Sequence, residues 1–103
     1  MAPPKLTAEQ RATALEKAAR ARRVRSEMKD LLKSGEVTFP ALLERASTDE
    51  LIDGMKVFAA LSAMPGTGKI KAKRMMEELN IAANRRIRGL GERQRAALLD
   101  EFP

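Results

Sequence analysis

The most distinctive chemistry in the chain lies in a short basic segment near its C-terminal end, residues 84–91. This segment begins with Asn84 and has three arginines within four positions, two glycines and no acidic residue. Ile87 and Leu90 can anchor it to a core, which leaves the polar side chains facing outward. Arginine suits bidentate contacts with phosphate or guanine and fits narrow minor grooves, so the segment predicts a nucleic-acid contact. The arginines are Arg85, Arg86 and Arg88.

A second cluster of positive charge accompanies a glycine-containing turn. Pro65 ends the preceding helix, and the glycines at 66 and 68 permit positive φ. A new helix then begins, and its first turn has free backbone N–H groups with partial positive charge. Lysines surround that end, so we expect it to bind phosphate. The segment consists of Met64, Pro65, Gly66, Thr67, Gly68, Lys69, Ile70 and Lys71, with Lys73 just beyond it.

This turn is not a nucleotide-binding P-loop. That motif would need glycine at position 63 and a hydroxyl residue at position 70, where the chain has Ala63 and Ile70. The segment instead resembles the hairpin of helix-hairpin-helix modules, which grip the nucleic-acid backbone without reading its sequence. The alternative is an ordinary corner between two helices.

A long helix is predicted from Ala8 to about Lys33. Thr7 and Gln10 have the spacing of a capping box, and Gly35 supplies the stop. Large apolar residues occur mainly in its second half, so we expect that half to pack on the core and the first half to project or to pack on a partner. The predicted buried positions are Ala21, Val24, Met28, Leu31 and Leu32.

Opposite this apolar face we expect a basic stripe. Four of its members have no acidic residue three or four positions away that could neutralise them on the helix surface. The stripe is therefore a candidate phosphate-binding face, with an ordinary solvated face as the alternative. The four residues without such an acidic neighbour are Arg11, Arg22, Arg25 and Lys29, and the fifth member of the stripe is Lys33.

The rest of the pattern is also helical. Thr38 caps a short helix that has Pro40 in its first turn, and a single helical turn follows from Asp49 to about Asp53. Apolar spacing predicts further helices over residues 57–64, after the turn at 66–68, and from Glu92 to Phe102. No strand is evident, so the predicted fold class is all-α, with a long N-terminal helix followed by a compact helical domain.

The charge of the chain is unevenly distributed. Lysine and arginine number 20 against 14 acidic residues, for a net charge of +6. The acidic excess lies in residues 35–55, which carry five acidic side chains and one basic side chain. This middle third is predicted to supply core packing, whereas the basic regions on either side of it are candidates for binding a polyanion.

The composition excludes several kinds of chemistry. The chain has no Cys, His, Trp or Tyr, so it offers no thiol, no imidazole base and no zinc or iron–sulfur site. No cofactor, metal or small-molecule substrate is predicted, and the scattered acidic residues do not suggest an enzyme. No apolar run reaches the roughly 18 residues of a membrane span, and we expect a soluble cytoplasmic protein.

Taken together, these segments resemble the actinobacterial (mycobacterial-type) integration host factor family over essentially the whole chain. The resemblance implies an N-terminal extension and long helix over residues 1–35 and a helix-two-turns-helix domain over residues 36–103. The segments that carry it are Leu6-Thr7-Ala8-Glu9-Gln10-Arg11, Ala14-Leu15-Glu16-Lys17-Ala18, Gly54-Met55-Lys56-Val57, Pro65-Gly66-Thr67-Gly68-Lys69 and Arg85-Arg86-Ile87-Arg88-Gly89-Leu90-Gly91.

The resemblance also implies a function. Such proteins are nucleoid-associated, bind double-stranded DNA with little sequence preference, bend or compact it, and assist a phage integrase. It assigns DNA contact to residues 64–71 and to the segment of about 82–94. Asn84 stands where Ser or Thr is expected in relatives. The predicted contacts of the second segment are Asn84, Arg85, Arg86, Arg88, Gly89 and Arg93, with Lys56 as a further candidate outside it.

Two other interpretations stay open at this point. The protein could bind a structured RNA or the ribosome through the same surfaces, although three aromatic residues in all argue against single-strand stacking. It could also act as a protein-interaction adaptor through its acidic middle and the projecting half-helix. No heptad seam is visible, so we expect a monomer.

Overall fold

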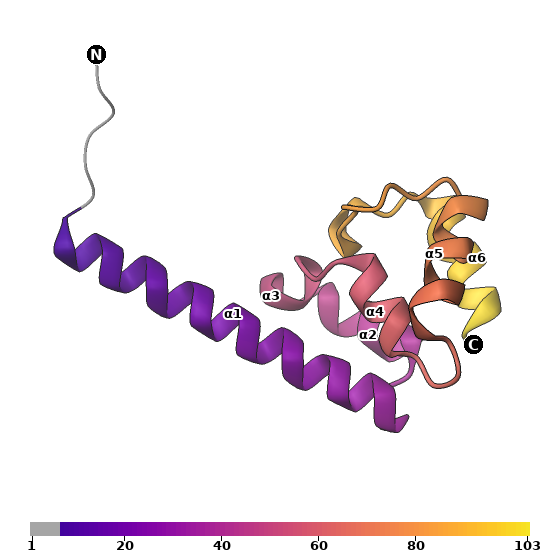
Figure 1. Cartoon of the computed structure of the whole chain (residues 1–103), viewed down its shortest axis with the longest axis horizontal. Helices are drawn as coiled ribbons and strands as arrows, with labels where there is room; N and C mark the ends of the chain where they lie inside the picture. The colour runs from indigo at the N-terminus through magenta and orange to yellow at the C-terminus, as the bar shows by residue number, and fades with distance from the viewer. Residues whose placement is uncertain (1–6) are drawn as a thin grey trace, which may run out of the picture.

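The computed structural model describes residues 7–103 and confirms the all-helical fold (Figure 1). No described residue belongs to a β-strand, although Lys56 and Arg86 form one isolated antiparallel bridge. The elements are α1 (Ala8–Ser34), α2 (Phe39–Ala46), α3 (Glu50–Asp53), α4 (Val57–Ala63), α5 (Gly68–Glu78), the 3₁₀ turn η1 (Ile87–Gly89) and α6 (Glu92–Glu101).

The first helix forms where the sequence predicts it. The Thr7 side chain accepts a hydrogen bond from the Gln10 N–H at 3.1 Å, and the Gln10 side chain accepts one from the Thr7 N–H at 2.9 Å. Gly35 ends the helix in the left-handed conformation, at φ +81°. This reciprocal cap satisfies two N–H groups that would otherwise lack an intrahelical partner.

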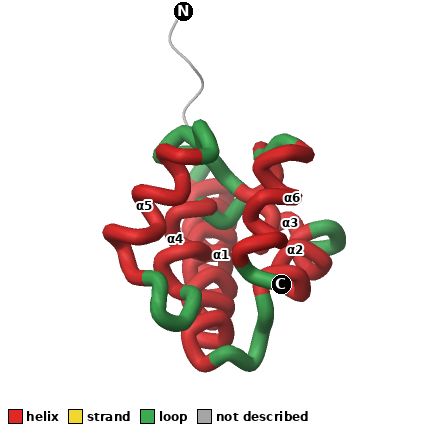
Figure 2. The backbone as a smooth tube through the Cα atoms, turned by 90° about the vertical axis from the view of Figure 1, so that its right-hand side faces the viewer, coloured by secondary structure: helices red, strands yellow, loops and turns green. Residues whose placement is uncertain are grey.

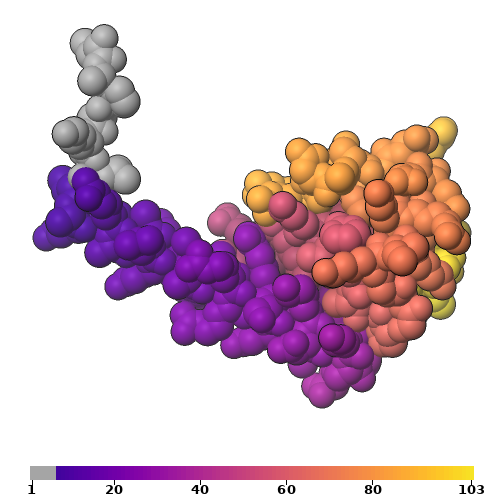
Figure 3. All heavy atoms as spheres, viewed as in Figure 1, coloured from indigo at the N-terminus to yellow at the C-terminus, as the bar shows by residue number. Residues whose placement is uncertain are grey.

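The two halves of α1 differ in their surroundings. Met28 and Leu32 are buried, whereas every residue from 8 to 20 is exposed. The space-filling view shows this first half standing clear of the rest of the molecule (Figure 3). The prediction that only the second half packs on the core is therefore confirmed.

The core is formed by the second half of α1 with the five later α-helices and η1. Helices α4 and α5 lie side by side and are joined by the turn at 64–67, while α6 packs on the other side of the domain (Figure 2). The ring centroids of Phe39 and Phe102 lie 5.7 Å apart, which ties α2 to the end of α6. The largest fully buried side chains are Phe39, Leu32, Leu42, Met55, Leu61, Ile87, Leu98 and Val57.

The acidic middle third supplies core residues, as its pattern predicts. Leu42 and Leu43 of α2 and Ile52 of α3 are buried. Thr38 caps α2 by accepting a hydrogen bond from the Ala41 N–H at 3.3 Å. Within the described residues, no helix is both long and apolar enough to cross a membrane.

Candidate nucleic-acid interface

A short backbone pairing joins the basic segment 84–91 to the connection between α3 and α4. The Val57 N–H donates to the Arg85 carbonyl, and the Ile87 N–H donates to the Met55 carbonyl, both at 2.9 Å. This pairing is the antiparallel bridge between Lys56 and Arg86. It holds two basic residues together that lie 30 positions apart in the sequence.

Gly54 lies directly beneath two arginine side chains. The Arg86 guanidinium donates through Nη1 to the Gly54 carbonyl, and the Arg25 Nε donates to the Leu51 carbonyl at 3.0 Å. A Cβ atom at Gly54 would lie only 2.6 Å from Nη2 of Arg25. Its φ of −83° suits any residue, so glycine is needed here because of space. The two guanidinium groups, one from α1 and one from the basic segment, are thus held on two carbonyls of the same short stretch, Leu51 and Gly54.

These arginines belong to a groove between α1 and the start of α4, with a volume of about 400 Å³. Met55, Ala59 and Ser26 also line this groove, and none of its lining residues, all within the described part of the chain, is acidic. Five positive side chains in one concave surface raise the local concentration of an anion, because the field is focused there. We call this surface the basic groove; its cations are Arg22, Arg25, Lys29, Lys56 and Arg86.

The groove corrects the expected position of the α1 stripe. Arg25 and Lys29 do not lie opposite the buried face of α1; they flank it, because each directly follows a residue of that face, Val24 or Met28. One residue corresponds to about 100° around the helix, which brings these cations to the edge where α1 meets α4. Arg25 is half-buried and hydrogen-bonded, so it is not an ordinary solvated side chain.

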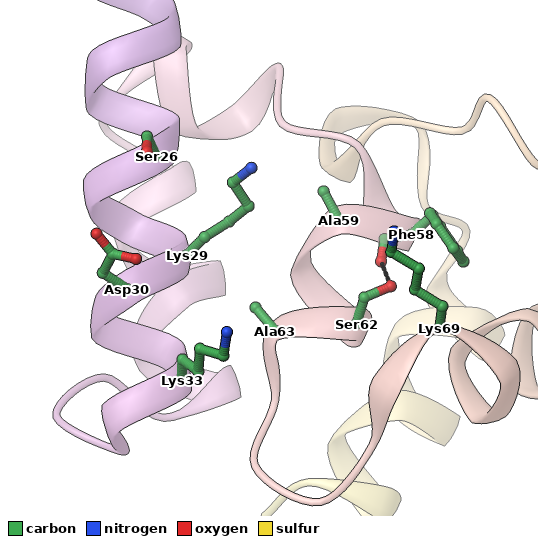
Figure 4. A pocket seen from close by; sticks show the side chains of 9 residues that line it. All are labelled: Ser26, Lys29, Asp30, Lys33, Phe58, Ala59, Ser62, Ala63 and Lys69. Carbon is green, nitrogen blue, oxygen red and sulfur yellow. Dashed lines mark hydrogen bonds between the residues drawn. The ribbon is translucent and has the colours of Figure 1, made fainter.

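A second hollow, of about 380 Å³, continues from the basic groove along α1 and α4. The two share Ser26, Lys29 and Ala59 among their lining residues. Lys29 and Lys33 extend from α1 toward α4, and Lys69 folds back beside Phe58 (Figure 4). Asp30 also lines this second hollow, so its charge is less uniform than that of the basic groove.

The turn after α4 has the predicted backbone, and its two lysines line different hollows. Gly66 and Gly68 have φ values of +74° and +70°. Lys69 lines the hollow beside α1, whereas Lys71 lines a different one with Glu78 and Glu101, and their shared phosphate contact at the start of α5 stays a prediction. Residues two positions apart on a helix are separated by about 200° around its axis, so these two side chains point in different directions.

The remaining predicted residues of the turn differ in exposure. Pro65 and Ile70 are exposed, and Ile70 is 79% accessible, which is unusual for a large aliphatic side chain. Met64 and Thr67 are half-buried. Lys73 is exposed and lines an apolar hollow together with Phe58. No side-chain hydrogen bond from Thr67 caps α5, so the N–H groups of its first turn are not occupied by that cap.

The three arginines of the basic segment do not all face outward. Arg88 is exposed, but Arg85 and Arg86 are half-buried. The Arg85 Nη1 donates to the Gly89 carbonyl at 2.7 Å, and a Cβ at Gly89 would lie 2.7 Å from the Arg85 Cδ. The expectation of three free arginines is therefore corrected for two of them, because Arg85 closes the loop onto Gly89 and Arg86 is bonded to Gly54. Asn84 and Arg93 are exposed.

Two residues that support the basic segment were not predicted from the sequence. The Gln94 Oε1 accepts from the Gly91 N–H at 3.0 Å, and its Nε2 donates to the Asn80 carbonyl at 3.1 Å, which ties the start of α6 to the end of α5. Arg95 is half-buried, with its Nη2 3.5 Å from the Ile87 carbonyl. A glutamine three residues after a glycine cap is a recognisable signal for Gln94, whereas nothing local marks Arg95.

Comparison with known proteins defines the class first. Residues 32–102 match the S13-like H2TH domain, so the protein contains a helix-two-turns-helix domain. A solved structure described as sIHF bound to an 8bp palindromic DNA is similar, with a TM-score of 0.81 and 44% identity over 85% of this chain and 99% of that chain.

Curated relatives then define the family. The chain is 58% identical over 102 residues to the integration host factor of Mycolicibacterium smegmatis and 57% identical to that of Mycobacterium tuberculosis. Each match covers 99% of this chain and 97% of the relative. The integration host factor of Streptomyces coelicolor is 49% identical over 99% of this chain and 95% of the relative. The chain therefore belongs to the integration host factor family of mycobacteria and Streptomyces, as the sequence motifs indicate.

Proposed function

We propose that this protein binds duplex DNA as a non-enzymatic architectural protein of the nucleoid. The observation that carries the proposal is the basic groove, where five cations from α1, the α3–α4 connection and segment 84–91 converge and no lining residue is acidic. Membership of the integration host factor family and the similarity to a protein solved in complex with DNA support it.

The groove is suited to the phosphate backbone. Arg25 and Arg86 each use a donor on a protein carbonyl, which fixes the guanidinium plane and leaves further N–H groups for a ligand. A fixed guanidinium loses little conformational entropy on binding phosphate. Backbone contacts set position and affinity but carry no sequence information directly, so low sequence specificity follows.

Bending would follow from the engagement of two separate surfaces. The first surface is the basic groove between α1 and α4. Segment 84–91, which contributes Arg86 to this groove, also carries the exposed Arg88. The turn at 64–71 is the second surface that we propose to contact DNA, through Gly66, Gly68 and the first N–H groups of α5. A rigid protein can satisfy both at once only by curving the duplex, and assistance of a phage recombination complex would depend on that curvature.

Salt dependence tests the electrostatic basis of the proposal. If about six phosphates are neutralised, log K falls against log salt with a slope near −5. The variant Lys29→Ala/Lys56→Ala removes two exposed cations of the basic groove without touching a described hydrogen bond. Its charge-matched control is Arg20→Ala/Arg45→Ala, because both residues are exposed and neither lines the groove.

The measurement is fluorescence anisotropy with ~25-bp DNA and RNA duplexes of matched sequence at two salt concentrations. We expect the groove variant to bind DNA at least tenfold more weakly than the wild type, with a slope reduced by about 2, and the control to change little. Tighter binding to the RNA duplex by the wild type would overturn the DNA proposal in favour of a structured-RNA partner. Equal losses in the two variants would remove the groove from the interface.

A further inference from the structure

The first half of α1 has no tertiary packing in the described structure, yet it is helical. Every residue from 8 to 20 is exposed, and Leu15 is 69% accessible. A helical segment of this length without packing is marginal in water. The sequence favours its helix in two ways: the capping box at Thr7 and Gln10, and a high content of alanine, the strongest helix former. These alanines are Ala8, Ala12, Ala14, Ala18 and Ala19.

This exposed segment carries a cation in line with the basic groove. Arg11 precedes Arg22 by eleven residues, about three helical turns, so the two side chains leave α1 on the same side. Lys29 follows Arg22 by seven residues, about two turns, and lines the groove with it. The face shared by these three residues therefore continues from the groove along the free half of the helix.

The acidic residues of the free half avoid that face. Glu9 and Glu16 lie about 140° or more around the helix axis from Arg11. Between Arg11 and Arg22 the same face carries Leu15 and Ala18, which are small or uncharged. A polyanion following the groove toward the N-terminus thus meets Arg11 without passing a carboxylate of α1.

The space beside this face is open. The first half of α1 projects away from the compact domain, so an open angle lies between the two. The segment that contains Arg86 belongs to the domain (Figures 1 and 3). The distance along the helix axis from Arg22 to Arg11 is about 16 Å, close to the rise of five base pairs. On the face that Figure 3 shows, no other described part of the chain covers the projecting segment.

We propose that the first half of α1 is a preformed arm that binds the phosphate backbone of the same duplex that occupies the basic groove, with Arg11 as its contact. The arm extends the bound length of DNA by about half a helical turn beyond the groove. This inference rests on the proposed DNA-binding function and goes beyond it, because it assigns a further interaction surface and its orientation on the duplex.

The affinity test compares Arg11→Ala with Arg20→Ala on duplexes of about 10 and 25 bp. Both residues are exposed on the same half of α1, but Arg20 leaves the helix on the opposite side from Arg11. We expect Arg11→Ala to weaken binding of the long duplex by about three- to tenfold and to lower its salt slope by about 1. Neither variant should change binding of the short duplex, which the groove alone can hold.

A cleavage test locates the arm on the bound DNA without removing a charged side chain. Because the chain has no cysteine, Leu15→Cys and Thr13→Cys each give one attachment point for an iron chelate that cleaves nearby DNA. Leu15 is on the Arg11 side of the helix and Thr13 on the far side, and both are exposed. We expect strand cleavage about half a turn from the groove contacts with the chelate at position 15, and at most weak cleavage with it at position 13.

The outcomes separate the two proposals. If the wild type binds no duplex, the DNA-binding function itself is overturned. If the wild type binds and the groove variant is impaired, but Arg11→Ala keeps full affinity on the long duplex and position 15 gives no cleavage, only the arm is overturned. Circular dichroism of Arg11→Ala with unchanged helix content assigns its loss of affinity to the missing charge.

Discussion

The basic groove has five cations and the turn at 64–71 has two, and the two regions organise them in opposite ways. In the groove, cations from three distant segments converge, and two of them are fixed by backbone carbonyls at Leu51 and Gly54. Around the turn, Lys69 and Lys71 are neighbours in sequence yet line different hollows. The comparison teaches that the direction in which side chains leave their elements, and not their closeness in the sequence, decides which charges act together.

The largest effect should come from removing Arg86, the arginine that segment 84–91 contributes to the basic groove. Arg86→Ala deletes a groove cation and leaves the carbonyl of the buried Gly54 without its described partner, at a cost of about 1 kcal/mol in folding free energy. We expect DNA affinity to fall by about ten- to a hundredfold in an anisotropy titration, more than for Lys69→Ala/Lys71→Ala. Arg86→Lys should restore only part of it, because lysine lacks the planar fork.

A greater loss in the lysine double variant than in Arg86→Ala would reverse the comparison and make the turn the principal contact. Urea unfolding of each variant is the companion measurement. It shows whether lost affinity follows lost structure, since the titration is interpretable only for variants that remain folded at the assay temperature.

A smaller effect should follow from crowding one arginine of the groove without removing it. In Gly54→Ala the new Cβ would approach Nη2 of Arg25 to 2.6 Å, so the flexible guanidinium must move. We expect a several-fold loss of DNA affinity with a change in unfolding free energy of about 1 kcal/mol or less. In an Arg25→Ala background, the same glycine substitution should have no further effect on affinity, and a full additional loss would show that Gly54 acts by another route.

The sequence predicts the helices well because their signals are local. The capping box of Thr7 and Gln10, the Thr38 cap and the spacing of Met28, Leu32, Leu61 and Leu98 are all resolved within a few turns of helix. The position of the Arg11–Lys29 stripe was predicted less well. Its placement opposite the apolar face overlooked that Arg25 and Lys29 each adjoin a buried-face residue, which puts them at the contact with α4.

The sequence could not predict that the cations of the basic groove converge, and the reason is different. It depends on the pairing of Lys56 with Arg86 and on two arginines sharing Gly54, contacts that span about 30 residues. An isolated two-residue bridge has no periodic pattern, and a glycine with φ −83° gives no turn signal. Basic residues could therefore be identified as candidates, but not which of them form one surface.

The smallest expected effect concerns the turn and decides whether its backbone is a contact at all. Gly66 has φ +74° and open space around the missing Cβ, so Gly66→Ala should cost about 1 kcal/mol of unfolding free energy through backbone strain alone. Gly35 is matched to it, with φ +81° and equally open surroundings, but it lies at the end of α1. If the groove dominates binding, both alanine variants should lose similar stability in urea and less than twofold in DNA affinity. A loss of affinity in Gly66→Ala alone, at equal stability, would instead mean that the turn approaches the duplex so closely that a methyl group interferes, and that both surfaces hold DNA at once.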